Sequence, residues 1–369
     1  MSSTNKDRSE KLAWLVTLAG VEGVGPFRLY HLINHFGSPE KALSASIAKL
    51  TEIPGIGRDT ASKIRENQDH KKSLRFIDEV LKHEWKFFLY DDPEYPEPLG
   101  NIPDRPPYLF YLGEFTEKDI SAISIVGSRS ASEDGRLFAE NLSTALAENE
   151  VTVISGMARG VDIAAHRGAL KANGRTIAVL GCSLDIIYPP EAKNLAHKIT
   201  QSGALFSEFL PGTAPYGPNF PKRNRIISGL SQGVVVIEAA ERSGALSTAR
   251  HAIAQNREVF AVPGSPRSEM SRGTNRLIKE GAKLLTSVED IFCELPRLKG
   301  QVRTGQVKRI EGLTDTEKKV LDSFAEGPVQ IDNLSRTAGT PLPELMQILL
   351  ALELKGIIKE LSGKRYILN

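Results

Sequence analysis

The sequence predicts an α/β protein with a mostly parallel sheet at its centre and smaller, largely helical regions at both ends. Six short apolar runs in the middle of the chain consist mainly of β-branched residues without alternation, a pattern typical of strands buried on both faces. Amphipathic stretches separate them, so strand and helix alternate through right-handed crossovers and form a Rossmann-like core. The runs are 123–126, 151–154, 176–180, 204–206, 234–237 and 259–262.

The length of 369 residues suits two or three domains. We expect an N-terminal helical domain over residues 1–84, the Rossmann-like core over 85–294, a basic linker over 295–310 and a winged-helix domain over 311–369. The linker carries Arg297, Lys299, Arg303, Lys308 and Arg309 without an acidic residue. It is either a solvated flexible connector or a tether that also contacts phosphates.

Two glycine turns identify the N-terminal region as a pair of helix-hairpin-helix units in a SAM-like domain. The first is Gly23-Val24-Gly25, and the second is Ile53-Pro54-Gly55-Ile56-Gly57, which a helix start follows. Such hairpins offer backbone N–H groups to DNA phosphates without reading bases. The alternative is a helical scaffold that keeps the glycines only for the geometry of its turns.

The C-terminal region has the pattern of a winged helix. Residues 314–317 form a capping box, helical stretches follow, and two short strands at 357–361 and 365–368 flank a Ser-Gly turn. The third helix carries Glu344 and Glu353 against a single lysine, Lys355, which is a poor set for reading bases. We therefore expect protein contact, or weak phosphate contact by the wing through Lys359, Lys364 and Arg365.

Composition sets the cellular context. The 47 basic and 45 acidic residues leave a net charge of only +2, so nucleic-acid binding must depend on local clusters. The two cysteines, Cys182 and Cys293, stand in unrelated contexts, which argues against a zinc site and for a reducing compartment. No signal-peptide core or membrane-length apolar run occurs, so we expect a cytoplasmic protein.

Glycine-containing loops follow the predicted strands and form the candidate site. Ligands of open parallel sheets bind outside the carboxyl ends of the strands, and a glycine before a helix N-terminus suits anions. Basic residues in the same loops make phosphate the expected ligand. The candidate residues are Gly127, Ser128, Arg129, Ser155, Gly156, Arg159, Gly160, Phe220, Lys222, Arg223, Asn224, Arg225 and Gly244.

Common nucleotide cofactors do not fit these loops. The first loop is not GxGxxG, the second strand ends in Ser155 rather than a ribose-binding acid, and no GxxxxGK[ST] loop occurs. We expect no cofactor, no metal and no catalytic residue. Asp162 either only stabilises its helix by interacting with the helix dipole or takes part in the candidate site. His166 is expected to be a packed, hydrogen-bonded histidine. Glu208 and Glu238 are expected to cap neighbouring loops.

For Arg129 and Phe220 we expect specific roles in DNA binding. A guanidinium clamps phosphate in a bidentate way, and an aromatic ring beside basic residues is typical of a stacking platform for unpaired bases. The alternatives are that Phe220 only packs under its loop and that Arg225 pairs with Glu208 or Glu238.

The core resembles the DNA-processing protein A family, also called DprA or Smf. The resemblance covers about residues 87–292 and is most specific over 220–230. The matching stretches are 126–129, 155–162 with Ala165-His166, Tyr188-Pro189, 220–230 and 261–264. Two places depart from the family pattern, namely the loop 181–183 and residues 191–193.

The resemblance implies a homodimer that binds single-stranded DNA and helps load the RecA recombinase on incoming DNA during natural transformation. It implies no catalysed reaction, and it puts Arg129 and residues 222–225 in the DNA pocket. Two other functions stay open. One is a nucleotide phosphoribohydrolase-like enzyme of the same superfamily. Such enzymes have a glycine-rich loop and a catalytic glutamate, which Glu238, Gly244 and Thr248 resemble weakly. The other is a regulator that binds duplex DNA through the winged helix.

Overall fold

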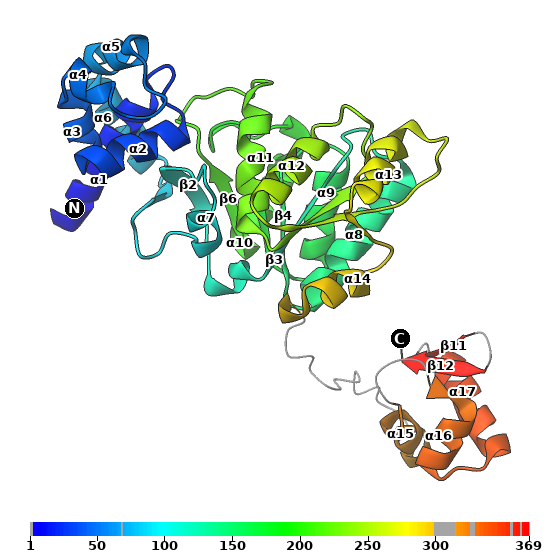
Figure 1. Cartoon of the computed structure of the whole chain (residues 1–369). Helices are drawn as coiled ribbons and strands as arrows, with labels where there is room; N and C mark the ends of the chain where they lie inside the picture. Colours follow the sequence, from blue (N-terminus) through cyan, green and yellow to red (C-terminus); the bar gives the residue numbers. More distant parts are fainter. Residues whose placement is uncertain are drawn as a thin grey trace. The chain divides into compact units, whose positions relative to one another are not determined.

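A computed structural model describes residues 3–67, 69–298, 314–324, 329–354, 357–361 and 364–368 (Figure 1). The chain divides into two compact units, Met1–Val302 and Arg303–Asn369, and each is described by itself. In the described part of the chain, no helix is both long and apolar enough to cross a membrane. Several sequence expectations lie outside the described residues: those on Lys299, Arg303, Lys308, Arg309, Lys355, the Ser362-Gly363 turn and the side chain of Lys359.

The first unit contains a nine-stranded sheet in the order β1-β2-β6-β5-β4-β3-β7-β8-β9. From β6 to β9 in this order all neighbours are parallel, whereas β1 and β2 add antiparallel strands at one edge. Strands β3 to β8 coincide with the six apolar runs, which confirms the mostly parallel Rossmann-like core. The strands are β1 (Lys86–Leu89), β2 (Tyr108–Gly113), β3 (Ala122–Gly127), β4 (Thr152–Ser155), β5 (Thr176–Val179), β6 (Ala204–Ser207), β7 (Gly233–Ile237), β8 (Glu258–Ala261) and β9 (Lys283–Leu284).

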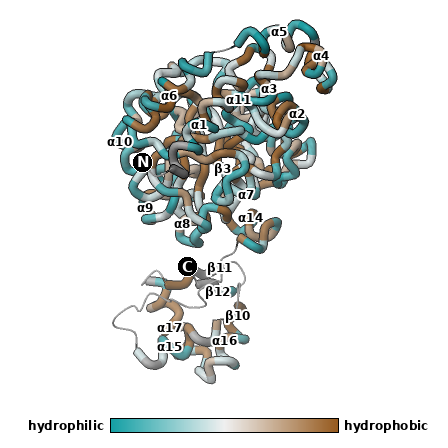
Figure 2. Tube along the Cα trace, turned by 90° about the vertical axis from the view of Figure 1, so that its left-hand side faces the viewer, coloured by the Kyte–Doolittle hydropathy of each residue, from teal (hydrophilic) through white to brown (hydrophobic). Residues whose placement is uncertain are grey.

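Helices cover both faces of this sheet, because alternate residues of each strand point to opposite sides. Ile123 and Ile125 of β3 belong to the cluster with α8, α9 and α14, whereas Val126 belongs to the cluster with α11 and α12. Figure 2 shows the hydrophobic residues along β3 in the interior. The helices are α7 (Glu97–Gly100), α8 (Glu133–Glu148), α9 (Val161–Lys171), α10 (Lys193–Ser202), α11 (Asn219–Leu230), α12 (Ala245–Ala254), α13 (Arg272–Lys279) and α14 (Val288–Glu294).

Six N-terminal helices pack on the antiparallel side of the sheet within the same unit. Leu12 and Leu29 share a hydrophobic cluster with Phe110 of β2 and Leu205 of β6, and Arg8 pairs with Asp92 at 2.6 Å. The predicted boundary after residue 84 falls in the turn between α6 and β1. The helices are α1 (Ser3–Ala19), α2 (Pro26–Phe36), α3 (Pro39–Ser44), α4 (Ile47–Leu50), α5 (Arg58–Glu66) and α6 (His70–Lys82).

Both predicted hairpins are present. Gly23 and Gly55 have φ of 89° and 82°, a backbone that glycine adopts without strain, and Gly25 and Gly57 are the N-caps of α2 and α5. Arg28 donates to the carbonyl oxygen of Gly23 at 2.6 Å, which ties α2 back to its own turn.

The second unit is the predicted winged helix. The capping box at Thr314 is present, with Glu317 accepting from the Thr314 backbone N–H at 2.8 Å. Leu345, Leu349 and Leu352 of the third helix are buried in the unit's core. The elements are α15 (Asp315–Asp322), β10 (Val329–Gln330), α16 (Ile331–Ala338), α17 (Leu342–Leu354), β11 (Ile358–Leu361) and β12 (Arg365–Leu368), with the strands in the order β10-β12-β11.

Candidate nucleic-acid interface

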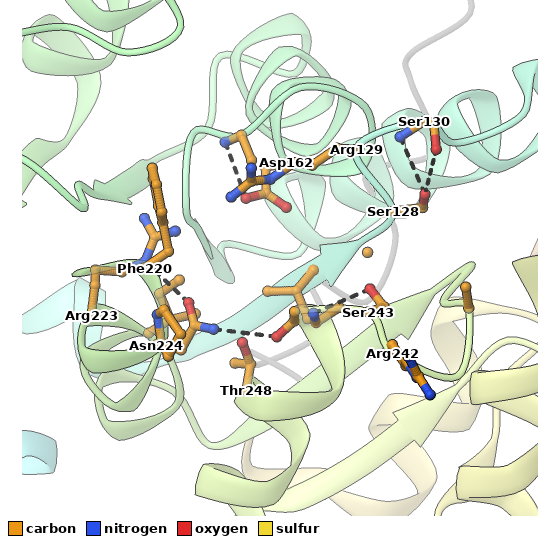
Figure 3. A pocket seen from close by; sticks show the side chains of 18 of the residues that line it. Ser128, Arg129, Ser130, Asp162, Phe220, Arg223, Asn224, Arg242, Ser243 and Thr248 are labelled. Atoms are coloured by element: carbon orange, nitrogen blue, oxygen red, sulfur yellow. Dashed lines mark hydrogen bonds between the residues drawn. The ribbon is translucent and has the colours of Figure 1, made fainter. Parts of the chain in front are cut away.

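A cavity of about 570 Å³, which we call the rim cavity, opens at the carboxyl ends of β3 and β7 (Figure 3). From β3 the chain crosses through α8 to β4, and from β7 it crosses through α12 to β8 on the other side. Such a switch point is where open α/β sheets bind their ligands. Of the candidate residues, seven line this cavity: Gly127, Ser128, Arg129, Phe220, Arg223, Asn224 and Gly244. The other six lie around it: Ser155, Gly156, Arg159, Gly160, Lys222 and Arg225.

Arg129 and Phe220 meet at the mouth of the rim cavity. The guanidinium carbon of Arg129 lies 4.8 Å from the centre of the Phe220 ring, which is cation–π geometry. Arg129 is exposed and Phe220 is half-buried. The other contacts of Phe220 are with Tyr188, whose ring centre is 6.0 Å away, and with the backbone at Gly181, where a Cβ would collide with the ring. Phe220 thus packs over its loop and also lines the cavity.

The segment 220–225 is the first part of helix α11 rather than a loop. A helix turns about 100° per residue, so successive side chains of this segment lie on different sides. Phe220, Arg223 and Asn224 line the rim cavity, whereas Lys222 and Arg225 line a second cavity beside it. The three basic residues therefore do not form one continuous charged strip.

Arg223 is buried beneath the rim cavity, with 4% of its surface exposed. Its guanidinium donates to the carbonyl oxygens of Gly156, at 2.7 Å, and Val179. Burial lowers its pKa to about 10. The resemblance puts residues 222–225 in the DNA pocket, and Arg223 does line the rim cavity, but these backbone carbonyl oxygens occupy its guanidinium. Its bonds hold the turn after β4 against the end of β5.

Arg225 is also buried and internally paired. Its Nη2 lies 2.6 Å and 2.7 Å from the two carboxylate oxygens of Glu208, and its Nε lies 3.7 Å from Asp104. The alternative that Arg225 pairs with Glu208 is confirmed. Lys222, by contrast, is exposed.

Two glycines set the close packing of the loops around the rim cavity. A Cβ at Gly127 would collide with the carbonyl oxygen of Ile237, and one at Gly160 would collide with that of Ser128. Gly160 also has φ of 78°, so a side chain there would be strained as well as crowded. Ser155 is buried and donates to the carbonyl oxygen of Ile125 at 2.6 Å, which is a structural contact.

The N-terminus of α12 lies at the rim cavity, where its first N–H groups are bonded within the turn. Ala245 N–H donates to the Ser243 hydroxyl at 3.3 Å, and Leu246 N–H donates to the Ser243 carbonyl oxygen at 3.2 Å. Gly244 is its N-cap without a side-chain cap, and its carbonyl oxygen accepts from Asn224 Nδ2 at 3.3 Å. The Thr248 hydroxyl lines the same wall, is buried, and has no hydrogen-bond partner among the described residues. A hydroxyl in the first turn of a helix suits one phosphate group.

Arg159 lies outside the rim cavity. Its exposed guanidinium forms a bidentate pair with Glu191, at 2.5 Å and 3.1 Å, and this pairing raises its pKa. A phosphate at Arg159 would have to compete with that carboxylate. This partner comes from residues 191–193, one of the two places where the sequence departs from the family pattern.

The acidic and imidazole groups near the site have structural partners. Glu238 accepts from the Ser132 backbone N–H at 2.8 Å and from its hydroxyl at 2.5 Å, at the start of α8. His166 is fully buried, its Nδ1 lies 2.7 Å from Thr176 Oγ1, and burial lowers its pKa to about 3. The expectations of a capping Glu238 and a packed His166 are confirmed. Burial raises the pKa of Asp162 to about 6.

Arg242 and Met270 are among the residues of the rim cavity that sequence reasoning missed. Arg242 is an exposed cation in the loop between β7 and α12, and it stands directly before Ser243 and Gly244. Its place after a strand end was a usable signal. Met270 accepts a contact of 3.5 Å from the Ser128 hydroxyl, and its distance in sequence left no signal. Among the described residues, no group of three or more His, Cys, Asp or Glu side chains is placed to hold a metal ion.

Comparison with known families and proteins finds matches over most of the chain. Residues 86–296 match the family described as DNA recombination-mediator protein A. Residues 15–67 match a SAM-like helix-hairpin-helix tandem, and 307–364 match the DprA winged helix domain. Protein Smf of Synechocystis is 34% identical over 98% of this chain and 99% of its own length. Protein Smf of Escherichia coli is 41% identical over 91% and 93%.

Two solved structures are similar as well. DNA processing protein A from Streptococcus pneumoniae superposes with a TM-score of 0.65 and 34% identity, covering 77% of this chain and 97% of its own. DNA processing protein A from Helicobacter pylori gives a TM-score of 0.52 and 28% identity, covering 58% and 96%, and its structure is described as one of a single-stranded DNA binding mode.

Proposed function

Because the chain belongs to the DNA recombination-mediator protein A family, we propose that it binds single-stranded DNA at the rim cavity and acts as a recombination mediator. The observation that carries this proposal is the exposed Arg129 guanidinium over the Phe220 ring at the rim cavity. The N-terminal residues of helix α12 line the same cavity. The description of the Helicobacter pylori relative supports the choice of a single strand.

Each part of the rim cavity recognises a different part of a nucleotide. Arg129 and the exposed Arg242 supply charge for phosphates, and the Thr248 hydroxyl in the first turn of α12 offers a neutral donor to a phosphate placed deeper. Phe220 offers an aromatic face on which an unpaired base stacks. A duplex keeps its bases stacked inside, so only a single strand uses both kinds of group.

The physiological role that we propose is loading of the RecA recombinase on incoming single strands during natural transformation. The family membership and the similarity to DNA processing proteins of Streptococcus pneumoniae and Bacillus subtilis support it. A test is RecA filament assembly on DNA coated with single-strand binding protein. The wild type should accelerate assembly, and an equal rate without the protein would contradict this role.

We further propose a homodimer through the edge strand β9. Of the apolar residues in segment 275–292, Leu277, Leu285 and Ile291 are buried inside the unit, whereas Leu284 is 51% exposed on the last strand of the sheet. An unpaired edge with an exposed leucine suits self-pairing about a two-fold axis. Light scattering at micromolar concentration should give a dimer that Leu284→Glu converts to monomer, and a monomeric wild type would refute it.

We propose that the chain is not an enzyme. The glutamate that would be catalytic in a phosphoribohydrolase, Glu238, does not line the rim cavity and is bound to Ser132 at the start of α8. Incubation with AMP should release no adenine. Release that Glu238→Gln abolishes would favour the enzyme.

The decisive experiment compares single-stranded and duplex DNA at two salt concentrations, with wild type and Arg129→Ala. We expect a preference for the single strand. Arg129→Ala should weaken binding and lower the slope of log affinity against log salt by about 0.7, the value of one phosphate contact on a single strand. Circular dichroism verifies folding of the variant. Wild-type affinity in a folded Arg129→Ala protein would remove the rim cavity from the proposal.

A further inference from the structure

A second cavity of about 590 Å³ lies between the first hairpin of the helical domain and helix α11 of the core. We call it the hairpin cavity. Val24, Gly25 and Pro26 line it from the hairpin side, and Lys222 and Arg225 line it from α11. We propose that it binds the next nucleotides of the same single strand that occupies the rim cavity. This inference rests on the proposed function.

Continuity is the first argument. Pro221 lines both cavities, and the residues on either side of it divide between them, with Phe220 in the rim cavity and Lys222 in the hairpin cavity. Adjacent residues of a helix rise by about 1.5 Å, so only the first turn of α11 separates the two sites. A flexible strand that stacks on Phe220 reaches the hairpin cavity by crossing this turn.

The second argument is the chemistry of the walls. The half-buried Pro26 gives an apolar surface against which a base can lie, with the buried Leu29 and Pro107 beneath it. The carboxylates that line this cavity, Glu208 and Asp104, are both paired with Arg225. Lys222 is exposed at this cavity and has no hydrogen bond or ion pair among the described residues, so its ammonium group is available to a phosphate. A base surface next to a free cation is the combination that single-strand binding proteins use.

Unused donors on both sides are the third argument. Helix α2 begins at the glycine N-cap Gly25, which makes no side-chain hydrogen bond, and its first residue, Pro26, has no N–H group. The backbone N–H groups of Phe27 and Arg28 therefore lack a cap. On the facing side, Arg225 is 5% exposed, and its buried Nη1 has no hydrogen-bond partner among the described residues. The pairing with Glu208 already balances the charge of Arg225, so Lys222 and the α2 N–H groups are the phosphate-binding groups here.

The experiment measures the affinity of the full chain for oligothymidylates from about 4 to about 16 nucleotides, the range of site sizes in single-strand binding folds. Wild-type affinity should rise in a second step once the strand is long enough to cross Pro221. Lys222→Glu should remove that step, lowering affinity for the longest strand about tenfold or more, and should leave the shortest strand unaffected. The matched control is Lys118→Glu, an exposed lysine that precedes the amino end of β3, whereas the rim cavity lies at its carboxyl end.

Cross-linking gives a readout that does not depend on charge. Gly25 has open space around its Cα, so Gly25→Cys is accommodated, and a Cys293→Ser background removes the exposed cysteine. A thiol-tethered long oligonucleotide should cross-link to Gly25→Cys, and a short one should not. A single plateau in the length series, with Lys222→Glu equal to wild type and no cross-link, would refute the hairpin cavity. Unchanged short-strand affinity in Arg129→Ala would instead refute the rim cavity.

Discussion

The strand-end rim of the core and the third helix of the winged-helix unit are both places where their folds bind ligands, but their chemistry differs. At the rim, Arg129 and Arg242 are exposed beside a half-buried aromatic ring. Helix α17 instead exposes Leu342, Met346 and Leu350, spaced four residues apart, so that they lie on one side of the helix. A fold associated with DNA therefore does not by itself make a DNA surface, because the exposed side chains decide what binds.

A second contrast lies inside the core, between basic residues that face the ligand and those that hold the rim together. Arg223→Met tests it with the largest expected effect, a loss of about 3–5 kcal/mol in the free energy of unfolding. The carbonyl oxygens of Gly156 and Val179 would lose their donor, and the buried Asp162 would lose its neighbouring cation.

Urea unfolding of Arg223→Met and of Arg129→Met makes the comparison. Arg129 is exposed, so its replacement should change stability by no more than about 0.5 kcal/mol. Equal stabilities of the two variants would mean that Arg223 is not a structural element of the rim.

Substitutions of Phe220 test whether its ring stacks on DNA bases or only packs against its own loop. The expected effect on single-strand affinity is about 1–3 kcal/mol. Phe220→Ala should lose this affinity while leaving the salt slope unchanged, since no phosphate contact is removed. Phe220→Leu keeps an apolar side chain against Gly181 and Tyr188 but has no aromatic face. If the leucine variant binds as tightly as wild type, the ring serves only to pack its loop.

The sheet was predictable because its strands are buried on both faces and their apolar runs are continuous. Strands β1 and β2 escaped prediction, because an antiparallel edge at Lys86–Leu89 depends on pairing with β2 rather than on a long apolar run. At the site, Arg129 was predictable from its place after the first core strand. Arg159 was selected in the same way, as a basic residue after a strand end. Its position in the sequence could not reveal that its guanidinium forms an ion pair with Glu191.

Lys222, Arg223 and Arg225 look alike in sequence, but Lys222 is exposed in the first turn of α11 and both arginines are buried. Helix α11 is buried on all sides from Arg223 to Leu230, so a helical period in the sequence could not identify the buried arginines. The partner of Arg225 could not be inferred, because Glu208 reaches it from another strand end.

The pH dependence of stability should also separate the two units, since all seven histidines lie before residue 252. Burial, with a smaller contribution from Arg223, lowers the pKa of His166 from 6.5 to about 3. The folded state thus binds fewer protons than the unfolded chain below pH 6.5, so the contribution is complete above that pH and is lost as pH falls towards 3. At pH 5 the loss is about 2 kcal/mol.

Urea unfolding at pH 7.5 and pH 5 measures this loss, and His166→Gln removes the titrating group. The raised pKa of Asp162 has the opposite sign between pH 4 and pH 6, but it is present in both proteins and cancels in the difference. The same pH dependence in wild type and His166→Gln would show that His166 titrates normally.

The smallest expected effect is on removal of the winged-helix unit. A chain that ends at Pro296 should keep most of its single-strand affinity, because it retains the whole rim cavity. The exposed stripe of α17 is apolar and lies beside the exposed Glu344, so it offers nothing to phosphates. The wing presents Lys364 and Arg365 on its exposed side. Loss of a weak contact there would reduce the salt slope by less than the 0.7 of one full phosphate contact.

A second chain that ends at Leu313 retains the basic linker, so the difference between the two truncations isolates the linker's contribution. A tenfold loss in both would place the single-strand site in the winged helix and overturn the contrast between the two units, whereas a loss only in the shorter chain would assign phosphate contact to the linker.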